Sequence, residues 1–222
     1  MSRLRFPMLG AILVLAFLPW ALSQDTTLGE QIAQQGTPAG VTPCMACHGQ
    51  AGSSFAGTPF PRLAGLDMEY IVKQLRDFQA GLRADAMMSP VAALLEVPEM
   101  EAVAAYFAEQ VPPPLPTPDD AAQVALGMDI ANRGLWSVYL PACASCHGPL
   151  GVGVGDTFPA LAGQNAVYTV KQFENWRTGI RHNDVLGMMQ SVVERMTDEQ
   201  IAAVAAYYQS LGTDTQAAEG AE

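Results

Sequence analysis

Cysteine and histidine are scarce in this chain of 222 residues, and the scarcity limits what they can do. The four cysteines and two of the three histidines stand together in two short boxes, PCMACHGQAG from Pro43 and PACASCHGPLG from Pro141. No cysteine is left over for a wider disulfide framework of the kind that staples small secreted domains. The third histidine, His182, lies outside the boxes, and we expect it at the surface.

Basic residues are also few, with 11 Lys and Arg against 22 Asp and Glu, so the formal charge is −11. A surface with this excess of negative charge repels nucleic acid and anionic lipid, which disfavours both as partners. The same charge suits a protein partner with a basic docking patch. It is equally explained by solubility alone.

Long apolar runs are missing except at the N-terminus, where Met8 to Leu18 is continuous and apolar. Arg3 and Arg5 precede this run, and small residues at positions 21–23 follow it, which is the pattern of a cleaved signal peptide. The run is too short to cross a bilayer comfortably. We therefore predict a signal peptide over 1–23 and a periplasmic mature protein, with an uncleaved membrane anchor as the alternative.

The two boxes open a longer internal repeat, because four further motifs follow each box in the same order. The pairs are FPRLAG from Phe60 and FPALAG from Phe158, YIVKQLRDFQAGLR from Tyr70 and YTVKQFENWRTGIR from Tyr168, Met87-Met88 and Met188-Met189, and EAVAAYF from Glu101 and AAVAAYY from Ala202. Self-similarity of this kind indicates two homologous structural units. Each has under a hundred residues, so a large apolar cofactor would help to complete its core.

The repeat and the proline content set the expected domain bounds. The first unit spans 24–110, and the second spans 121–213. The stretch VPPPLPTPDD, 111–120, is rich in proline and predicts an extended linker between them. We expect an acidic flexible tail over 214–222.

The secondary structure is predicted to be helical. Residues 70–82 place apolar side chains at spacings of three and four, and Gly81 marks the end of this helix. Residues 100–107 are rich in alanine and also helical. Thr197 and Gln200 form the pattern of a capping box, and Asp119 or Asp120 can cap another helix that runs through Ala131. No convincing alternation of period two indicates a strand, so the fold class is all-α.

The boxes themselves have the form Cys-x-x-Cys-His. Residues at i, i+3 and i+4 share one face of a helical turn, so two thiols and one imidazole can meet a single group. This spacing is the attachment signature of c-type haem, which predicts two covalently bound haems and no other metal. Structural disulfides, zinc sites and a thioredoxin-type redox pair are the alternatives. Disulfides leave the repeated histidine unexplained, zinc lacks ligands, and the redox pair lacks a βαβ context.

A haem iron held by histidine needs a second axial ligand or an open site. The repeated methionine pairs stand about 40 residues after each box histidine, and a Met–His ligand pair is typical of electron-transferring cytochromes. The distance along the sequence from each methionine to the last helix of its unit is the same in both repeats, whichever member of the pair is counted. The residues alone therefore leave Met87 or Met88, and Met188 or Met189, as the ligands.

At this point the whole mature chain resembles a two-haem cytochrome c of the cytochrome c4 type. The resemblance implies two tandem cytochrome c-like domains, each a small helical fold wrapped around a covalent haem and related by internal duplication. It implies attachment at Cys44, Cys47, Cys143 and Cys146, and axial ligation by His48 and His147. Counting back from the last helical segment, it favours Met88 and Met189 as the other ligands. It also implies that the carbonyls of Pro61 and Pro159 orient the two histidines.

Further polar residues recur in both repeats. Tyr70, Lys73 and Gln74, with their counterparts Tyr168, Lys171 and Gln172, either hydrogen-bond to haem propionates or across the domain interface, or form an ordinary solvated helix face. Arg83 and Arg181 are candidates to pair with propionates.

The predicted function is that of a periplasmic di-haem electron carrier. It would take electrons from a quinol-oxidising complex or a dehydrogenase and deliver them to a terminal oxidase, through partners with basic docking surfaces. It meets membranes only through partner complexes, and no substrate-converting site is recognised. The alternatives are a cytochrome subunit of a membrane oxidase or dehydrogenase, and a di-haem peroxidase-type enzyme, which would need an open iron site.

Overall fold

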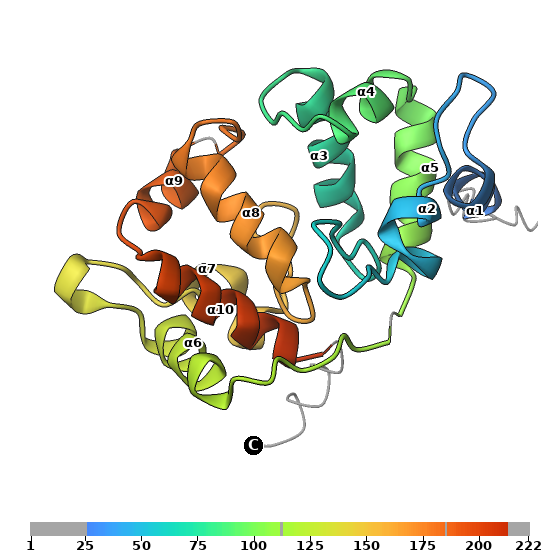
Figure 1. Ribbon diagram of the computed structural model, residues 1–222. Helices are drawn as coiled ribbons and strands as arrows, with labels where there is room; N and C mark the ends of the chain where they lie inside the picture. The colour runs from blue at the N-terminus through green and yellow to red at the C-terminus, as the bar shows by residue number, and fades with distance from the viewer. Residues whose placement is uncertain (1–25, 112, 185, 213–222) are drawn as a thin grey trace, which may run out of the picture.

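The computed structural model describes residues 26–111, 113–184 and 186–212, and within these the regular structure is helical (Figure 1). The β-bridges found there are isolated ones, at Arg83–Arg181, Leu135–Leu140 and Val154–Phe158. The all-α prediction is confirmed. The predicted signal peptide and acidic tail lie outside the described residues. Among the helices described, none is long and apolar enough to cross a bilayer.

The helices follow the same order in two halves of the chain (Figure 1). The first half contains α1 (Thr26–Gln35), α2 (Met45–His48), η1 (Gln50–Gly52), α3 (Met68–Gln79), α4 (Met88–Ala93) and α5 (Val97–Ala108). The second half contains α6 (Ala121–Arg133), η2 (Trp136–Val138), α7 (Ala144–His147), η3 (Pro149–Gly151), α8 (Ala166–Arg177), α9 (Met188–Val193) and α10 (Asp198–Ser210). The duplicated sequence therefore folds into duplicated structure.

Helix α3 begins and ends earlier than the predicted span of 70–82. It begins at Met68 because the Asp67 side chain accepts a hydrogen bond from the Tyr70 N–H and caps the first turn. It ends at Gln79, and Gly81 then takes a φ of 73° that terminates the helical path. Leu82 consequently lies outside the helix, and its side chain is exposed.

The caps of the later helices follow the sequence closely. Thr197 and Gln200 form the predicted capping box at the start of α10. Asp120, one of the two predicted candidates, caps α6 by accepting from the Gln123 N–H. Helix α5 starts three residues before the predicted 100–107 because Glu96 and Glu99 form a second capping box there. These local interactions fix the helices that carry the core.

In each half the first helix crosses the last one at a glycine. A Cβ atom on Gly29 would lie 2.1 Å from the Ala102 carbonyl oxygen, and one on Gly127 would lie 2.0 Å from that of Ala203. The backbones of α1 and α5, and of α6 and α10, therefore approach more closely than any side chain allows. Each crossing closes one hydrophobic cluster, the first around Met100 and Phe107 and the second around Ile130 and Tyr208.

The two halves form two lobes joined by the segment between α5 and α6, which runs along one side of the molecule (Figure 1). Buried polar contacts hold the lobes together. The Arg62 guanidinium donates to the Ala162 carbonyl at 2.6 Å, and Gln164 bonds both the N–H and the carbonyl of Arg62. Asn165 is fully buried and donates to the Phe55 carbonyl at 2.7 Å. The interface is thus specific and largely polar.

Candidate functional site

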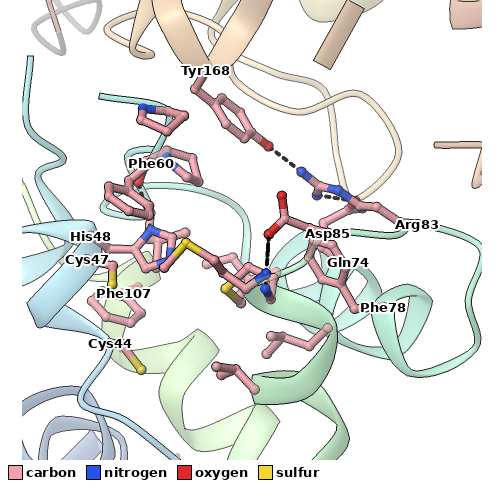
Figure 2. Close-up of a pocket in the computed structure, with 18 of the residues that line it drawn as sticks. Cys44, Cys47, His48, Phe60, Gln74, Phe78, Arg83, Asp85, Phe107 and Tyr168 are labelled. Atoms are coloured by element: carbon pink, nitrogen blue, oxygen red, sulfur yellow. Dashed lines mark hydrogen bonds between the residues drawn. The ribbon is translucent and has the colours of Figure 1, made fainter. Parts of the chain in front are cut away.

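A cavity of about 390 Å³ opens in the first half between the Cys-x-x-Cys-His box and helices α3 and α4 (Figure 2). Figure 2 shows Cys44, Cys47 and His48 on one side of it, with Gln74, Phe78, Arg83 and Asp85 on the other. Most of the wall is apolar. Leu66, Ile71, Leu75, Val91, Val103 and Phe107 all contribute to it. The space suits a large, flat, apolar group that reaches the box.

His48 is held in one orientation at the end of α2. It is 5% exposed, and its Nδ1 lies 3.0 Å from the Pro61 carbonyl oxygen. Because a carbonyl only accepts, Nδ1 carries the hydrogen and Nε2 keeps its lone pair. Burial lowers the pKa of His48, so the ring is neutral near pH 7. A neutral imidazole with a fixed orientation is the form that binds a metal ion.

The two thiols of the first box stand one turn apart on the same short helix. Cys44 and Cys47 are both half-buried and both line the cavity. Burial raises the pKa of Cys44 to about 11, so this thiol is protonated at neutral pH. The two thiols and the His48 imidazole line the same cavity, which is the arrangement that the Cys-x-x-Cys-His attachment signature requires.

The structure separates the two members of each methionine pair. Met88 packs against the first hydrophobic cluster, whereas Met87 is 52% exposed. In the second half Met189 packs against its cluster, and Met188 is 38% exposed. The more enclosed member is the one that the family resemblance favours as ligand, and its role stays a prediction.

The second box repeats the arrangement of the first. His147 is buried, and its Nδ1 lies 2.9 Å from the Pro159 carbonyl oxygen. Burial also lowers the pKa of His147. Cys143 packs against the second hydrophobic cluster, and Cys146 is half-buried. Both boxes therefore present a neutral imidazole beside two thiols.

The cavity of the first half is completed by the second half. Tyr168, Lys171, Gln172 and Asn175, all from α8, line it together with the first-half residues. The Tyr168 hydroxyl accepts a hydrogen bond from Arg83 at 2.7 Å (Figure 2). The repeated Tyr, Lys and Gln are therefore interface residues rather than a solvated helix face.

Two arginines meet at this interface. Arg83 and Arg181 are both buried, and their guanidinium groups bond to the side chains of Tyr70, Gln74, Tyr168, Gln172 and Asn183. Neither guanidinium is hydrogen-bonded to a carboxylate within the described residues. Buried positive charge favours a nearby anion, and Arg83 lines the cavity, so this part of the rim suits a group that carries carboxylates.

Comparison with known proteins identifies the class of this site. The sequence profile of the cytochrome c family matches residues 137–212. A cytochrome c4 from Thiocapsa roseopersicina is 42% identical over 76% of this chain and 86% of its own length. The chain belongs to the cytochrome c4 family. It is accordingly a di-haem electron carrier with two covalently attached c-type haems.

Two further comparisons concern thiosulfate oxidation. A thiosulfate dehydrogenase electron acceptor from Stutzerimonas stutzeri is 39% identical over 96% of this chain and 97% of its own length. The solved structure of a thiosulfate dehydrogenase from Marichromatium purpuratum superposes with a TM-score of 0.80 at 35% identity. That match covers 89% of this chain but only 42% of the dehydrogenase chain, so more than half of the dehydrogenase chain has no counterpart in the match.

The residues that line this cavity fit a haem in the first half. Cys44 and Cys47 would hold its vinyl side chains, His48 and Met88 would face the iron, and Arg83 would meet a propionate. Two observations support this placement: the cavity wall is apolar, and the buried Arg83 at its rim has only neutral hydrogen-bond acceptors among the described residues.

Two site residues escaped the sequence analysis. Asp85 bonds the backbone of both Met87 and Met88, and Arg62 crosses to the other lobe. An acidic residue just before each methionine pair, Asp85 and Asp184, is the signal that could have found the first. Nothing in the repeat marks Arg62, because its counterpart is Ala160.

Proposed function

We propose that this cytochrome c4 is a periplasmic carrier that accepts electrons from a thiosulfate-oxidising dehydrogenase and delivers them to a terminal oxidase. The observation that supports this role is the similarity to a thiosulfate dehydrogenase electron acceptor along nearly the full length of both chains. The resemblance to a solved thiosulfate dehydrogenase points to the same chemistry. The predicted signal peptide supports export to the periplasm.

Haem iron supplies one-electron redox chemistry, and the residues of this chain make that chemistry selective. Pro61 and Pro159 fix the two imidazoles, and Met88 and Met189 are the residues that would supply the second protein ligand to each iron. A Met–His pair raises the reduction potential. Both histidines are buried, which limits the access of bulk water to them. With protein side chains as both ligands, each iron would exchange electrons without binding a substrate.

Thiosulfate oxidation itself belongs to the partner in this proposal. An enzyme acting on a small substrate at haem needs an open or displaceable axial position. Two repeated methionine pairs argue against such a position here, and they argue equally against a peroxidase. The chain corresponds to less than half of the solved dehydrogenase, which leaves the remainder of that protein for other tasks.

The acidic surface suits the encounter with such a partner. The chain carries a formal charge of −11, so a partner with a basic patch would be attracted over about one Debye length, roughly 10 Å at 0.1 M salt. Electrostatic steering of this kind mainly raises the association rate. We therefore expect reduction by the dehydrogenase to slow as ionic strength rises.

Stopped-flow mixing tests the proposal directly. Oxidised, haem-loaded protein is mixed with a purified thiosulfate dehydrogenase and thiosulfate, and haem reduction is followed by visible absorption. Reduction of both haems within milliseconds to seconds, slower at high salt, supports the carrier role. Failure of the dehydrogenase to reduce the protein, together with rapid reduction by a quinol-oxidising complex, would assign it to the other electron source. Consumption of thiosulfate by the protein alone would make it an enzyme.

A further inference from the structure

One carboxylate joins the start of α4, which carries the methionine pair of the first half, to the second half. Asp85 Oδ2 accepts from Lys171 Nζ at 2.7 Å, and Lys171 belongs to α8 of the other lobe. Asp85 Oδ1 accepts from the backbone N–H groups of Met87 and Met88 at 2.9 and 3.1 Å. In Figure 2 the Asp85 carboxylate lies on the side of the cavity opposite His48, below Tyr168 of the second half.

The Lys171–Asp85 ion pair is partly shielded from solvent. The Asp85 side chain is 19% exposed and that of Lys171 is 41% exposed, and both residues line the cavity. The carboxylate is shared between two backbone N–H groups at the start of α4 and a lysine of the other lobe.

The repeat explains why this lysine reaches across. Its counterpart in the first half, Lys73, has Asp77 four residues later on its own helix and pairs with it at 2.5 Å. Lys171 has Asn175 at the equivalent position, so its own helix offers no carboxylate there. The lysine that lacks a local partner pairs with Asp85 instead.

The reciprocal ion pair does not exist in the part of the chain that the structure describes, because Lys73 reaches the other lobe only at the Asn183 carbonyl, 3.2 Å from its Nζ. Asp184 plays the role of Asp85 in the second half, because it accepts from the Met189 backbone N–H. No lysine or arginine forms an ion pair with Asp184 within the described residues. The carboxylate that accepts from the methionine backbone is therefore paired with a lysine at the start of α4 but not at the start of α9, although the methionine pair itself is repeated.

We propose that Lys171 is a positioning residue for the axial methionine of the first haem, acting across the interface through Asp85. The inference rests on the proposed assignment of Met88 as that ligand. With Lys171 in place, the carboxylate that fixes the Met87 and Met88 backbone is itself fixed. The Lys171–Asp85 contact between the lobes would therefore slow the loss of the methionine ligand at the first haem. It would have no such effect at the second haem.

Displacement of methionine by imidazole measures this firmness. Ferric haem shows a weak long-wavelength absorption band only while a methionine sulfur binds the iron, so loss of the band reports displacement. The full haem-loaded chain is used with Met189→His, so that only the first haem contributes the band. A parallel series with Met88→His reports on the second haem alone.

Four variants distinguish positioning from general loosening. Lys171→Gln removes the charge, and Lys171→Arg retains it. Asp85→Asn keeps an oxygen that accepts from the two methionine N–H groups but loses the ion pair. Lys73→Gln is the matched control, because it removes the equivalent lysine from the other repeat, whose partners are Asp77 and the Asn183 carbonyl of the other lobe.

We expect Lys171→Gln to speed displacement at the first haem by about threefold, the effect of one partly exposed ion pair. Lys171→Arg restores the original rate, and Lys73→Gln leaves it unchanged. In the Asp85→Asn background Lys171→Gln adds nothing, because the two residues act through one contact. At the second haem Lys171→Gln has no effect.

A change of less than about 1.5-fold for Lys171→Gln at the first haem would overturn the proposal, because the ion pair would then contribute almost nothing to the retention of the methionine. Equal acceleration at both haems would also overturn it, because that outcome means a loosened interface. If the parent protein lacks the band, the assignment of Met88 fails and takes this inference with it. If the parent protein shows the band and is reduced by the dehydrogenase, the ligand assignment and the proposed function both stand. A missing effect of Lys171→Gln would then contradict only the role of Lys171.

Discussion

The crossing of α6 and α10 at Gly127 gives a sharp prediction for stability. A methyl group on this residue would lie 2.0 Å from the Ala203 carbonyl oxygen and 2.8 Å from the Tyr207 Cβ. None of these neighbours is the free end of a flexible side chain, so the two helices must separate to admit it. We expect Gly127→Ala to destabilise the second half.

Two opposing effects set the magnitude. Replacing glycine by alanine within a helix normally stabilises by about 1 kcal/mol. Overpacking a close-packed interior costs about 1–3 kcal/mol, and the upper end applies where only backbone and Cβ atoms can yield. The steric cost wins, and the net loss of unfolding free energy is about 2 kcal/mol.

Guanidinium titration of the haem-loaded protein, followed by circular dichroism, measures the loss. Gly29→Ala is the paired test, because its Cβ meets the Ala102 oxygen in the same way in the first half. Met128→Ala on the exposed side of α6 is the control and should change stability by less than about 0.5 kcal/mol. An unchanged or raised midpoint for Gly127→Ala would refute the close backbone contact.

Four further substitutions test the site and the interface. Met88→Leu should abolish the long-wavelength methionine band of the first haem, whereas Met87→Leu should leave it intact, and the reverse result would exchange the two roles. Arg83→Gln should lower the potential of the first haem by on the order of 50 mV, because a buried positive charge favours the reduced iron; spectroelectrochemistry that shows no decrease would contradict this. Asn165→Ala should cost about 2 kcal/mol of thermal stability by leaving the Phe55 carbonyl and other buried polar groups unpaired, and a loss below about 0.5 kcal/mol would mean that water replaces the amide.

Features encoded over a few residues were predictable from the sequence. The capping box at Thr197 and the cap at Asp120 depend on side chains three residues from their partners, so the pattern alone suffices. The Cys-x-x-Cys-His boxes are likewise local. The signal for the true start of α3 is also local, because Asp67 caps the helix three residues before Tyr70.

The contacts between the two lobes could not be predicted from the sequence. Lys171 and Asp85 are 86 residues apart, and Arg62 and Ala162 are 100 apart. Internal repetition shows that two units exist, but it does not give the orientation of one unit against the other. The exchange of Asp77 for Asn175 between the repeats was visible, yet its meaning depends on which residue of the other lobe lies within reach.

The central claim is that both haem irons are closed by a protein ligand on each side, as an electron carrier requires. The most direct measurement is the visible spectrum of the reduced, haem-loaded protein with and without carbon monoxide. Two six-coordinate irons predict that carbon monoxide leaves the spectrum unchanged. A shift at either haem would reveal an open or labile iron and would contradict the carrier function.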